Sequence, residues 1–188
     1  MGMPAANADW TIDLLDALPE SSERFEIIDG ELFVTPSPGI EHQSVVGALL
    51  TRLYTYTRAI GIGKTVVSPS DVWRGERQKN RVQPDLYVVR RIDGATPPYP
   101  FHLRELLLAI EVASPGNPLL DYQVKRDLYL REGVSEYWVI NIEARNVSRW
   151  RGVDDPGEVS SQSIVWQPNG ANEPFELDLP SFFDEALG

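Results

Sequence analysis

The feature that most constrains the fold is a near-continuous apolar run from Leu106 to Ala113, which Ser114-Pro115-Gly116 interrupts. A strand that is apolar at almost every position is typical of a sheet covered on both faces. Helical and strand-like patterns alternate around this run. Helices are predicted over 9–18, 40–60 and 118–132, a hairpin over 25–35, and strands over 64–67, 71–74, 83–90, 136–142 and 146–151. This order predicts an α/β or α+β fold with a mixed central sheet flanked by helices.

The C-terminal part has weaker patterns, which predict strands near 163–167 and 175–177 and a turn at 182–187. A length of 188 residues suits one domain. We therefore expect a single domain over 1–188, with a core at about 12–150 and acidic flanks on both sides. The chain has no cysteine, which excludes disulfides, Cys-ligated zinc and a thiol nucleophile. The first residues lack a signal-peptide pattern and no apolar run approaches a membrane span, so we expect a cytoplasmic protein without a membrane partner.

The net charge of −11 would by itself argue against a nucleic-acid partner. The acidity, however, lies in the flanks, with −6 over residues 1–30 and −7 over 151–188, and the middle segment carries +2. Within it, the stretch from Arg74 to Arg91 is locally basic. Its candidate phosphate contacts are Arg74, Arg77, Lys79 and Arg81. The alternative is a solvated loop that keeps the protein soluble.

Two acidic residues stand in apolar strand patterns. Glu111 lies near the end of the Leu106–Ala113 run, where an unpaired buried carboxylate would cost several kcal/mol. It must be paired, protonated, metal-bound or at an open strand end. Asp85 follows Pro84 and precedes an apolar strand, although Asp is depleted in strands. The structural alternatives are a salt-bridged acid for Glu111 and a turn cap for Asp85.

Lys125 stands between Asp121 and Tyr129 at helical spacing, flanking the apolar stripe of the 118–132 helix. It could reach the end of the Glu111 strand, and the alternative is an exposed Asp–Lys pair. Two carboxylates on neighbouring strands can hold Mg²⁺ (or Mn²⁺), and a nearby lysine can stabilise charge on a phosphoryl group or orient water. The set suits metal-assisted phosphodiester hydrolysis.

These residues resemble the PD-(D/E)XK nuclease superfamily, and more narrowly the Uma-type restriction endonuclease family, over roughly residues 12–150. The matching segments are Phe25–Leu32, Pro36-Ser37-Pro38, Glu41-His42, Gln83–Leu86, Glu111–Pro115, Asp121 with Lys125 and Tyr129, and Gly133–Trp138. The resemblance implies a restriction-endonuclease-like fold with Asp85 and Glu111 as metal ligands. Ala113 replaces the lysine of the superfamily's Glu-x-Lys pattern, and Lys125 fits the position that Uma-type members use instead.

The family pattern also includes Glu31 and His42 as candidate catalytic residues, and the Val112 carbonyl as a further metal ligand. The alternatives are a solvated acid for Glu31 and a hydrogen-bonded structural histidine for His42. We therefore expect a metal-dependent endonuclease that hydrolyses DNA, and we leave a homodimer open. The competing hypotheses are a catalytically silent binding or regulatory module with the nuclease fold, and a metal-dependent hydrolase of small phosphoesters.

Overall fold

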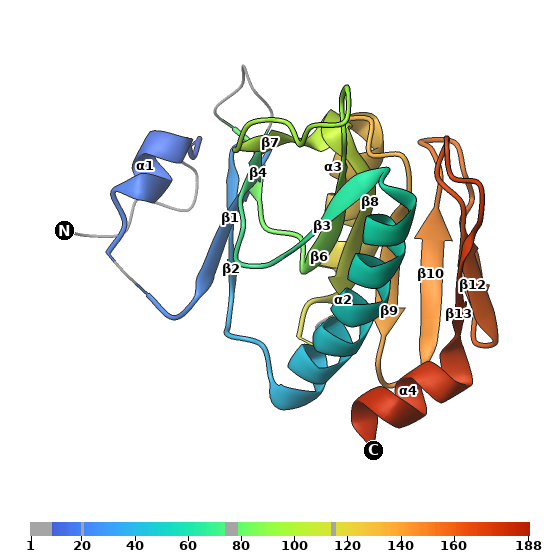
Figure 1. Ribbon diagram of the computed structural model, residues 1–188. Helices are drawn as coiled ribbons and strands as arrows, with labels where there is room; N and C mark the ends of the chain where they lie inside the picture. The colour runs from blue at the N-terminus through green and yellow to red at the C-terminus, as the bar shows by residue number, and fades with distance from the viewer. Residues whose placement is uncertain (1–8, 20, 74–78, 114–115) are drawn as a thin grey trace.

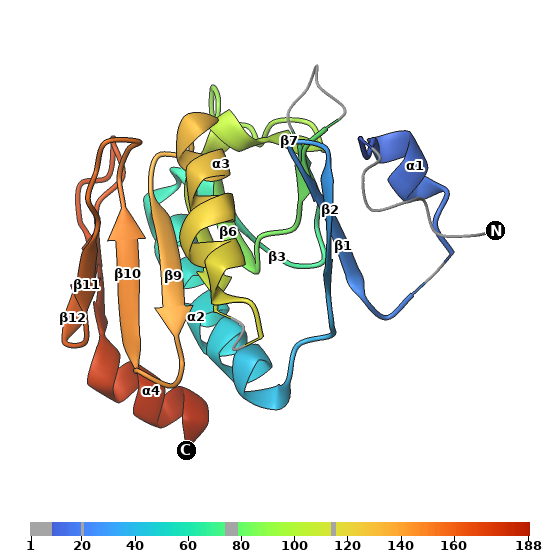
Figure 2. The same ribbon diagram turned by 180° about the vertical axis from the view of Figure 1, so that it is seen from behind.

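The computed structural model describes residues 9–19, 21–73, 79–113 and 116–188 (Figures 1 and 2). The helices are α1 (Ile12–Asp16), α2 (Ile40–Ile60), α3 (Arg126–Arg131) and α4 (Leu179–Leu187), with a 3₁₀ turn at Leu103–Glu105 and a π-helical segment at Leu120–Lys125. The strands are β1 (Arg24–Ile28), β2 (Glu31–Thr35), β3 (Gly63–Val67), β4 (Val72–Trp73), β5 (Arg81–Val82), β6 (Leu86–Arg90), β7 (Phe101–His102), β8 (Leu106–Val112), β9 (Tyr137–Asn141), β10 (Asn146–Trp150), β11 (Glu158–Ser160), β12 (Ser163–Trp166) and β13 (Phe175–Asp178). The predicted α/β class is confirmed. None of the helices in the described part of the chain has the length and hydrophobicity that a membrane span requires.

The central sheet has six strands in the order β11-β10-β9-β8-β6-β3. It is mixed, because β8 and β9 run parallel while the other neighbouring pairs are antiparallel. The apolar run of the sequence forms β8, an interior strand of this sheet. A second sheet has the order β2-β1-β5-β4-β7, and β12 and β13 form a separate hairpin.

Both faces of the central sheet are covered, which explains why β8 is apolar at almost every position (Figures 1 and 2). On one face, alternate residues of β6 and β8 pack with α2, α4 and the β12–β13 hairpin. On the other face, the intervening residues pack with α3, the π-helical segment and the second sheet. The C-terminal segment contributes Trp166, Phe182 and Phe183 to the first of these cores.

Local sequence signals determine several boundaries. Asp29 and Gly30 both have positive φ, 52° and 86°, so they form the tight turn that the Asp-Gly dipeptide predicts between β1 and β2. Gly61, with φ 76°, ends α2 in the left-handed conformation. Both elements were expected from these residues.

The structure differs from the predicted elements in several places. The helix predicted over 9–18 is shorter, the strand predicted over 83–90 begins at Leu86, and β7 and β11 were not predicted. The segment predicted as one helix over 118–132 is a π-helix at Leu120–Lys125 followed by the short α3, and such widened turns are frequent at functional sites. The predicted terminal turn is instead helix α4, because Asp178 caps it by accepting from Ser181 N–H at 2.9 Å. The predicted strand break at Ser114-Pro115 lies outside the described residues.

Candidate functional site

Asp85 and Glu111 lie at the same end of two neighbouring strands. Strands β6 and β8 pair antiparallel with Leu86 opposite Ile110, so Asp85, one residue before β6, stands opposite Glu111. Directly opposed residues project from the same face of a sheet. The Val112 N–H donates to Asp85 Oδ2 at 2.9 Å and connects the two strand ends directly.

The Asp85 carboxylate is buried and surrounded by donors. Arg24 Nη1 donates to Oδ1 at 2.8 Å and also to the Gln83 carbonyl at 2.9 Å. His42 Nε2, from the first turn of α2, lies 3.0 Å from Oδ2. Burial by itself would raise the pKa of Asp85, but the hydrogen bond to His42 and the charge of Arg24 hold that pKa well below its usual range. Asp85 is therefore a fixed negative charge.

Glu111 occupies a drier position, with only 1% of its surface exposed. Its Oε1 accepts hydrogen bonds from Lys125 Nζ at 3.1 Å and from the Tyr129 hydroxyl at 2.7 Å. Burial raises the pKa of Glu111 well above its usual range, with Lys125 opposing and the neighbouring Asp85 carboxylate adding to this effect. The ionised form of Glu111 therefore needs a cation beside it.

Lys125 supplies one such cation from the π-helical segment. Its side chain is buried, and Nζ lies 3.1 Å from Glu111 Oε1, 2.9 Å from Glu26 Oε2 and 3.8 Å from Asp121 Oδ1. Burial opposes the charged form, but the Glu111, Glu26 and Asp121 carboxylates together raise the pKa of Lys125 above its usual value. Lys125 is therefore a permanent positive charge at the end of β8.

Glu26 and Arg24 join Asp85, Glu111 and Lys125 in one acidic cluster, although neither was among the site residues expected from the sequence. Both lie on β1, and Glu26 is completely buried. Its Oε1 accepts from the Gln83 N–H at 2.8 Å. The only signal for Glu26 was an acid between apolar residues of a strand, the same signal that identified Glu111.

The structure does not bring the other candidate acid, Glu31, to this cluster. The hairpin register pairs Glu31 with Ile28, two residues beyond Glu26, and its side chain is exposed. No hydrogen bond or ion pair of the described residues joins Glu31 to Asp85 or Glu111.

The candidate phosphate contacts are partly neutralised by acidic side chains: Lys79 Nζ lies 2.9 Å from Asp9 Oδ2, and Arg81 forms an ion pair with Asp16. Arg74 and Arg77 lie outside the described residues.

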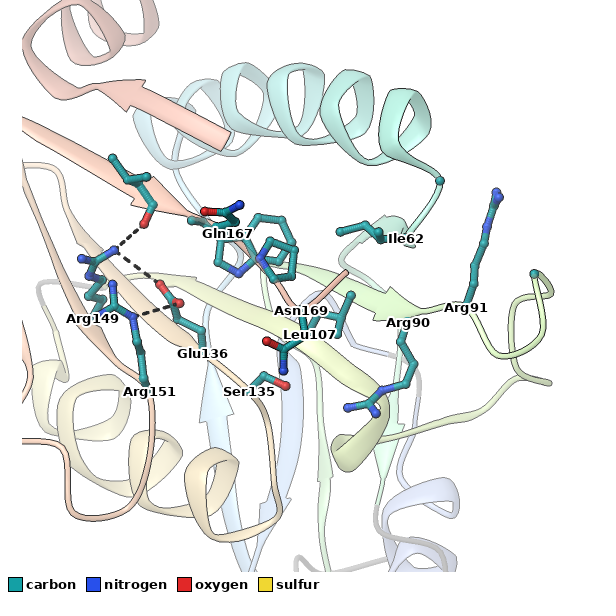
Figure 3. Close-up of a pocket in the computed structure, with 15 residues that line it drawn as sticks. Ile62, Arg90, Arg91, Leu107, Ser135, Glu136, Arg149, Arg151, Gln167 and Asn169 are labelled. Carbon is teal, nitrogen blue, oxygen red and sulfur yellow. Dashed lines mark hydrogen bonds and ion pairs between the residues drawn. The ribbon is translucent and has the colours of Figure 1, made fainter. Parts of the chain in front are cut away.

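A cleft of about 480 Å³ opens onto Asp85, with Arg24, His42 and Arg81 also lining it. A larger cavity of about 930 Å³ lies at the opposite end of the central strands (Figure 3), where Arg90 and Leu107 line it. Glu136 in that cavity is paired with Arg149 and Arg151 (Figure 3). The smaller cleft, rather than the larger cavity, is therefore the one that Asp85 lines.

The oxygen atoms available to a cation come from few residues. In the described part of the chain, no group of three or more His, Asp or Glu side chains is arranged to hold a metal ion. The donors at the strand ends are the Asp85 and Glu111 carboxylates and the Val112 carbonyl. Mg²⁺ commonly takes one or two carboxylates and completes its shell with water and substrate phosphate, so this small set fits its chemistry.

A mixed sheet between helices, with two acids and a lysine at one end of its central strands, defines a protein with a nuclease fold of the restriction-endonuclease type. The fold is similar to the crystal structure of a protein described as a "putative nuclease belonging to DUF820" from Anabaena variabilis ATCC 29413, with a TM-score of 0.76 and 21% identity over 95% of this chain and 99% of that one. The chain belongs to the Uma2 family, described as "Putative restriction endonuclease", which it matches over residues 12–183. No curated protein matches the sequence. The family match extends to residue 183, in the middle of α4, and so well beyond the resemblance found over 12–150.

Proposed function

We propose that the chain is an endonuclease that hydrolyses DNA phosphodiester bonds with Mg²⁺ or Mn²⁺ as its cofactor. The observation that carries this proposal is the opposed pair Asp85 and Glu111 at one strand end, with Lys125 Nζ 3.1 Å from Glu111. Membership of the Uma2 family supports a nuclease. Beyond a nuclease, we propose DNA as the substrate, a divalent cation as the cofactor and a role for each residue of the site.

The charge balance of the cluster supports a divalent cation. Among the described residues, Arg24, Lys125 and the His42 ring lie against four buried carboxyl groups, which belong to Glu26, Asp85, Glu111 and Asp121. Buried charges of one sign in excess are costly unless they are neutralised. One oxygen, Glu26 Oε2, makes no hydrogen bond among the described residues and has only the ion contact with Lys125 Nζ at 2.9 Å. A divalent cation held by Asp85, Glu111 and the Val112 carbonyl would balance this excess.

Each residue then has a definite role. The cation, when bound, would lower the pKa of a water molecule and polarise the scissile phosphate. Arg24 and the His42 ring fix the orientation of the Asp85 carboxylate. Lys125 orients the attacking water or stabilises the negative charge that develops on the phosphoryl oxygens. DNA would approach through the cleft that Asp85, Arg24 and His42 line, while Glu111 and Lys125 are buried and are not among its lining residues.

Plasmid cleavage with Mg²⁺ tests the proposal, with Glu111→Ala as the disabled variant and Glu136→Gln as a matched control. Glu136, like Glu111, is a buried glutamate, but it lines the cavity at the other end of the central strands. We expect the wild type and Glu136→Gln to nick the plasmid, and Glu111→Ala to be slower by about 100-fold or more. Equal background nicking by all three proteins would refute the proposal.

The second candidate is a binding or regulatory module that keeps the nuclease fold without turnover. It is favoured by the saturation of Asp85, whose two oxygens already contact Arg24, His42 and the Val112 N–H. This function predicts binding of DNA that needs no metal and is unaffected by Glu111→Ala. Measuring DNA binding with and without EDTA therefore separates the two functions.

A further inference from the structure

Glu26 is fixed in place by the second sheet. It lies on β1, is completely buried, and its Oε1 accepts the Gln83 N–H at 2.8 Å, just before the Pro84-Asp85 pair. Its other oxygen, Oε2, lies 2.9 Å from Lys125 Nζ, in an ion contact that lacks hydrogen-bond alignment. Oε2 therefore faces the ammonium group and has no other donor among the described residues.

The proposed function creates a conflict at Glu111. In this structure Lys125 donates to the same carboxylate that is assigned to the cation. A divalent cation on Glu111 would repel the ammonium group, and Lys125, which is only 1% exposed, has no direct route to solvent. A buried ammonium that leaves one carboxylate needs another within reach. Glu26 Oε2 is at 2.9 Å and Asp121 Oδ1 is farther away, at 3.8 Å.

We propose that Glu26 is a positioning residue that retains the Lys125 ammonium group when Glu111 binds the cation. Lys125 would then stay beside the reacting phosphate instead of competing for Glu111. This inference rests on the proposed function. It also gives the β1–β2 hairpin a role, because the hairpin's own strand carries the acid that holds the lysine of the π-helical segment.

Calorimetric titration with Mn²⁺ tests the proposal on four proteins: wild type, Glu26→Gln, Lys125→Met and the double variant. Without Glu26, Lys125 remains on Glu111 and competes with the cation, so we expect Glu26→Gln to weaken Mn²⁺ binding about tenfold. In the Lys125→Met background there is no ammonium to retain, and Glu26→Gln should leave the affinity unchanged. Near-ultraviolet circular dichroism verifies that each variant is folded.

Asp121→Asn is the matched control, because it removes the more distant carboxylate around the same ammonium group. It should weaken Mn²⁺ binding less than Glu26→Gln does. Equal weakening by Glu26→Gln in both lysine backgrounds, or by Asp121→Asn, would overturn the inference and leave the metal proposal standing. Absence of Mn²⁺ binding by the wild type would overturn both.

A crystal structure of the wild type with Mn²⁺ gives a second test that needs no variant. Lys125 Nζ should remain within hydrogen-bond distance of Glu26 and should have left Glu111. An ammonium group still on Glu111 beside the bound cation contradicts the inference.

Discussion

Lys125 Nζ lies 3.1 Å from Glu111 Oε1, although the two residues are 14 positions apart in the sequence. The lysine is supplied by the π-helical segment that follows β8, while Ala113 occupies the position two residues after Glu111. A lysine two residues after Glu111 would be held by the backbone of the same strand. A lysine on the helical segment can move away from Glu111 without any movement of the strand. The ion pair is thus a contact between two separate elements.

Lys125→Met should destabilise the metal-free protein. Removing one partner of a buried ion pair leaves uncompensated carboxylates, so we expect the free energy of unfolding at neutral pH to fall by about 3 kcal/mol. Urea unfolding in the presence of EDTA measures this change. Lys64→Met is the control, because Lys64 is an exposed lysine on β3 and its replacement should cost less than about 0.5 kcal/mol. Equal losses for the two variants would mean that the buried ion pair adds nothing to the free energy of unfolding beyond what an exposed lysine contributes.

Much of the fold could be predicted because local residues determine it. Asp29-Gly30 permits the positive φ angles of the hairpin turn, and Gly61 the left-handed end of α2. The apolar pattern of β8 indicated burial on both faces, which the two cores confirm. These features depend on a few neighbouring residues and need no knowledge of distant contacts.

The rest of the site depends on contacts between distant segments. Glu26 reaches Lys125 from another sheet, and Arg24 reaches Asp85 across 61 positions, so neither pairing has a local signal. The widened turn of the π-helix also has no mark in the apolar spacing. For Glu26, the signal was present: an acid in an apolar strand, as at Glu111. That signal identifies Glu26 as a site residue only once the structure shows that Glu26 and Glu111 contact the same lysine, Lys125.

Asp16→Asn should increase DNA affinity. Asp16 forms an ion pair with Arg81, one of the candidate phosphate contacts at the edge of the Asp85 cleft. Arg81 keeps a second ion contact, with Asp71 at 3.6 Å, so removing the Asp16 pair, which contributes about 0.2–1 kcal/mol, should tighten DNA binding by up to about 2- to 5-fold at low salt. Fluorescence polarisation with a labelled duplex measures the change, and its salt dependence should become steeper by up to about one unit.

Asp13→Asn is the control for this experiment. Asp13 is an exposed acid of the same helix α1, and it lacks an ion pair among the described residues. It lowers the negative charge by the same amount without releasing Arg81. A similar gain in affinity for both variants would show that total charge, and not the Arg81 contact, controls DNA binding.

Asp85→Asn should change the dependence of stability on pH. The pKa of Asp85 is lower in the folded protein than its ordinary value, so its stabilising contribution is fully present above about pH 4 and is lost as the pH falls through the folded pKa. In EDTA at pH 7 we expect Asp85→Asn to be less stable by about 2 kcal/mol, since Arg24 loses its charged partner. Urea unfolding at decreasing pH should show this difference narrowing below about pH 4.

Asp184→Asn is the control for the pH experiment, because its ion pair with Arg145 is exposed. Its replacement should alter stability by less than about 1 kcal/mol at any pH. A difference between wild type and Asp85→Asn that stays constant down to pH 3 would contradict the assignment of Asp85 as the stabilising charge.

Phe183→Ala should show that the C-terminal segment is part of the main core. Phe183 of α4 is completely buried and packs in the same cluster as residues of α2, β6 and β8. Truncating a buried phenylalanine leaves a cavity, so the free energy of unfolding should fall by about 3–5 kcal/mol in a urea titration. Val165→Ala, a partly exposed position of β12 in the same C-terminal segment, is the control and should cost much less. A small loss for Phe183→Ala would instead mean that α4 packs as a separable element.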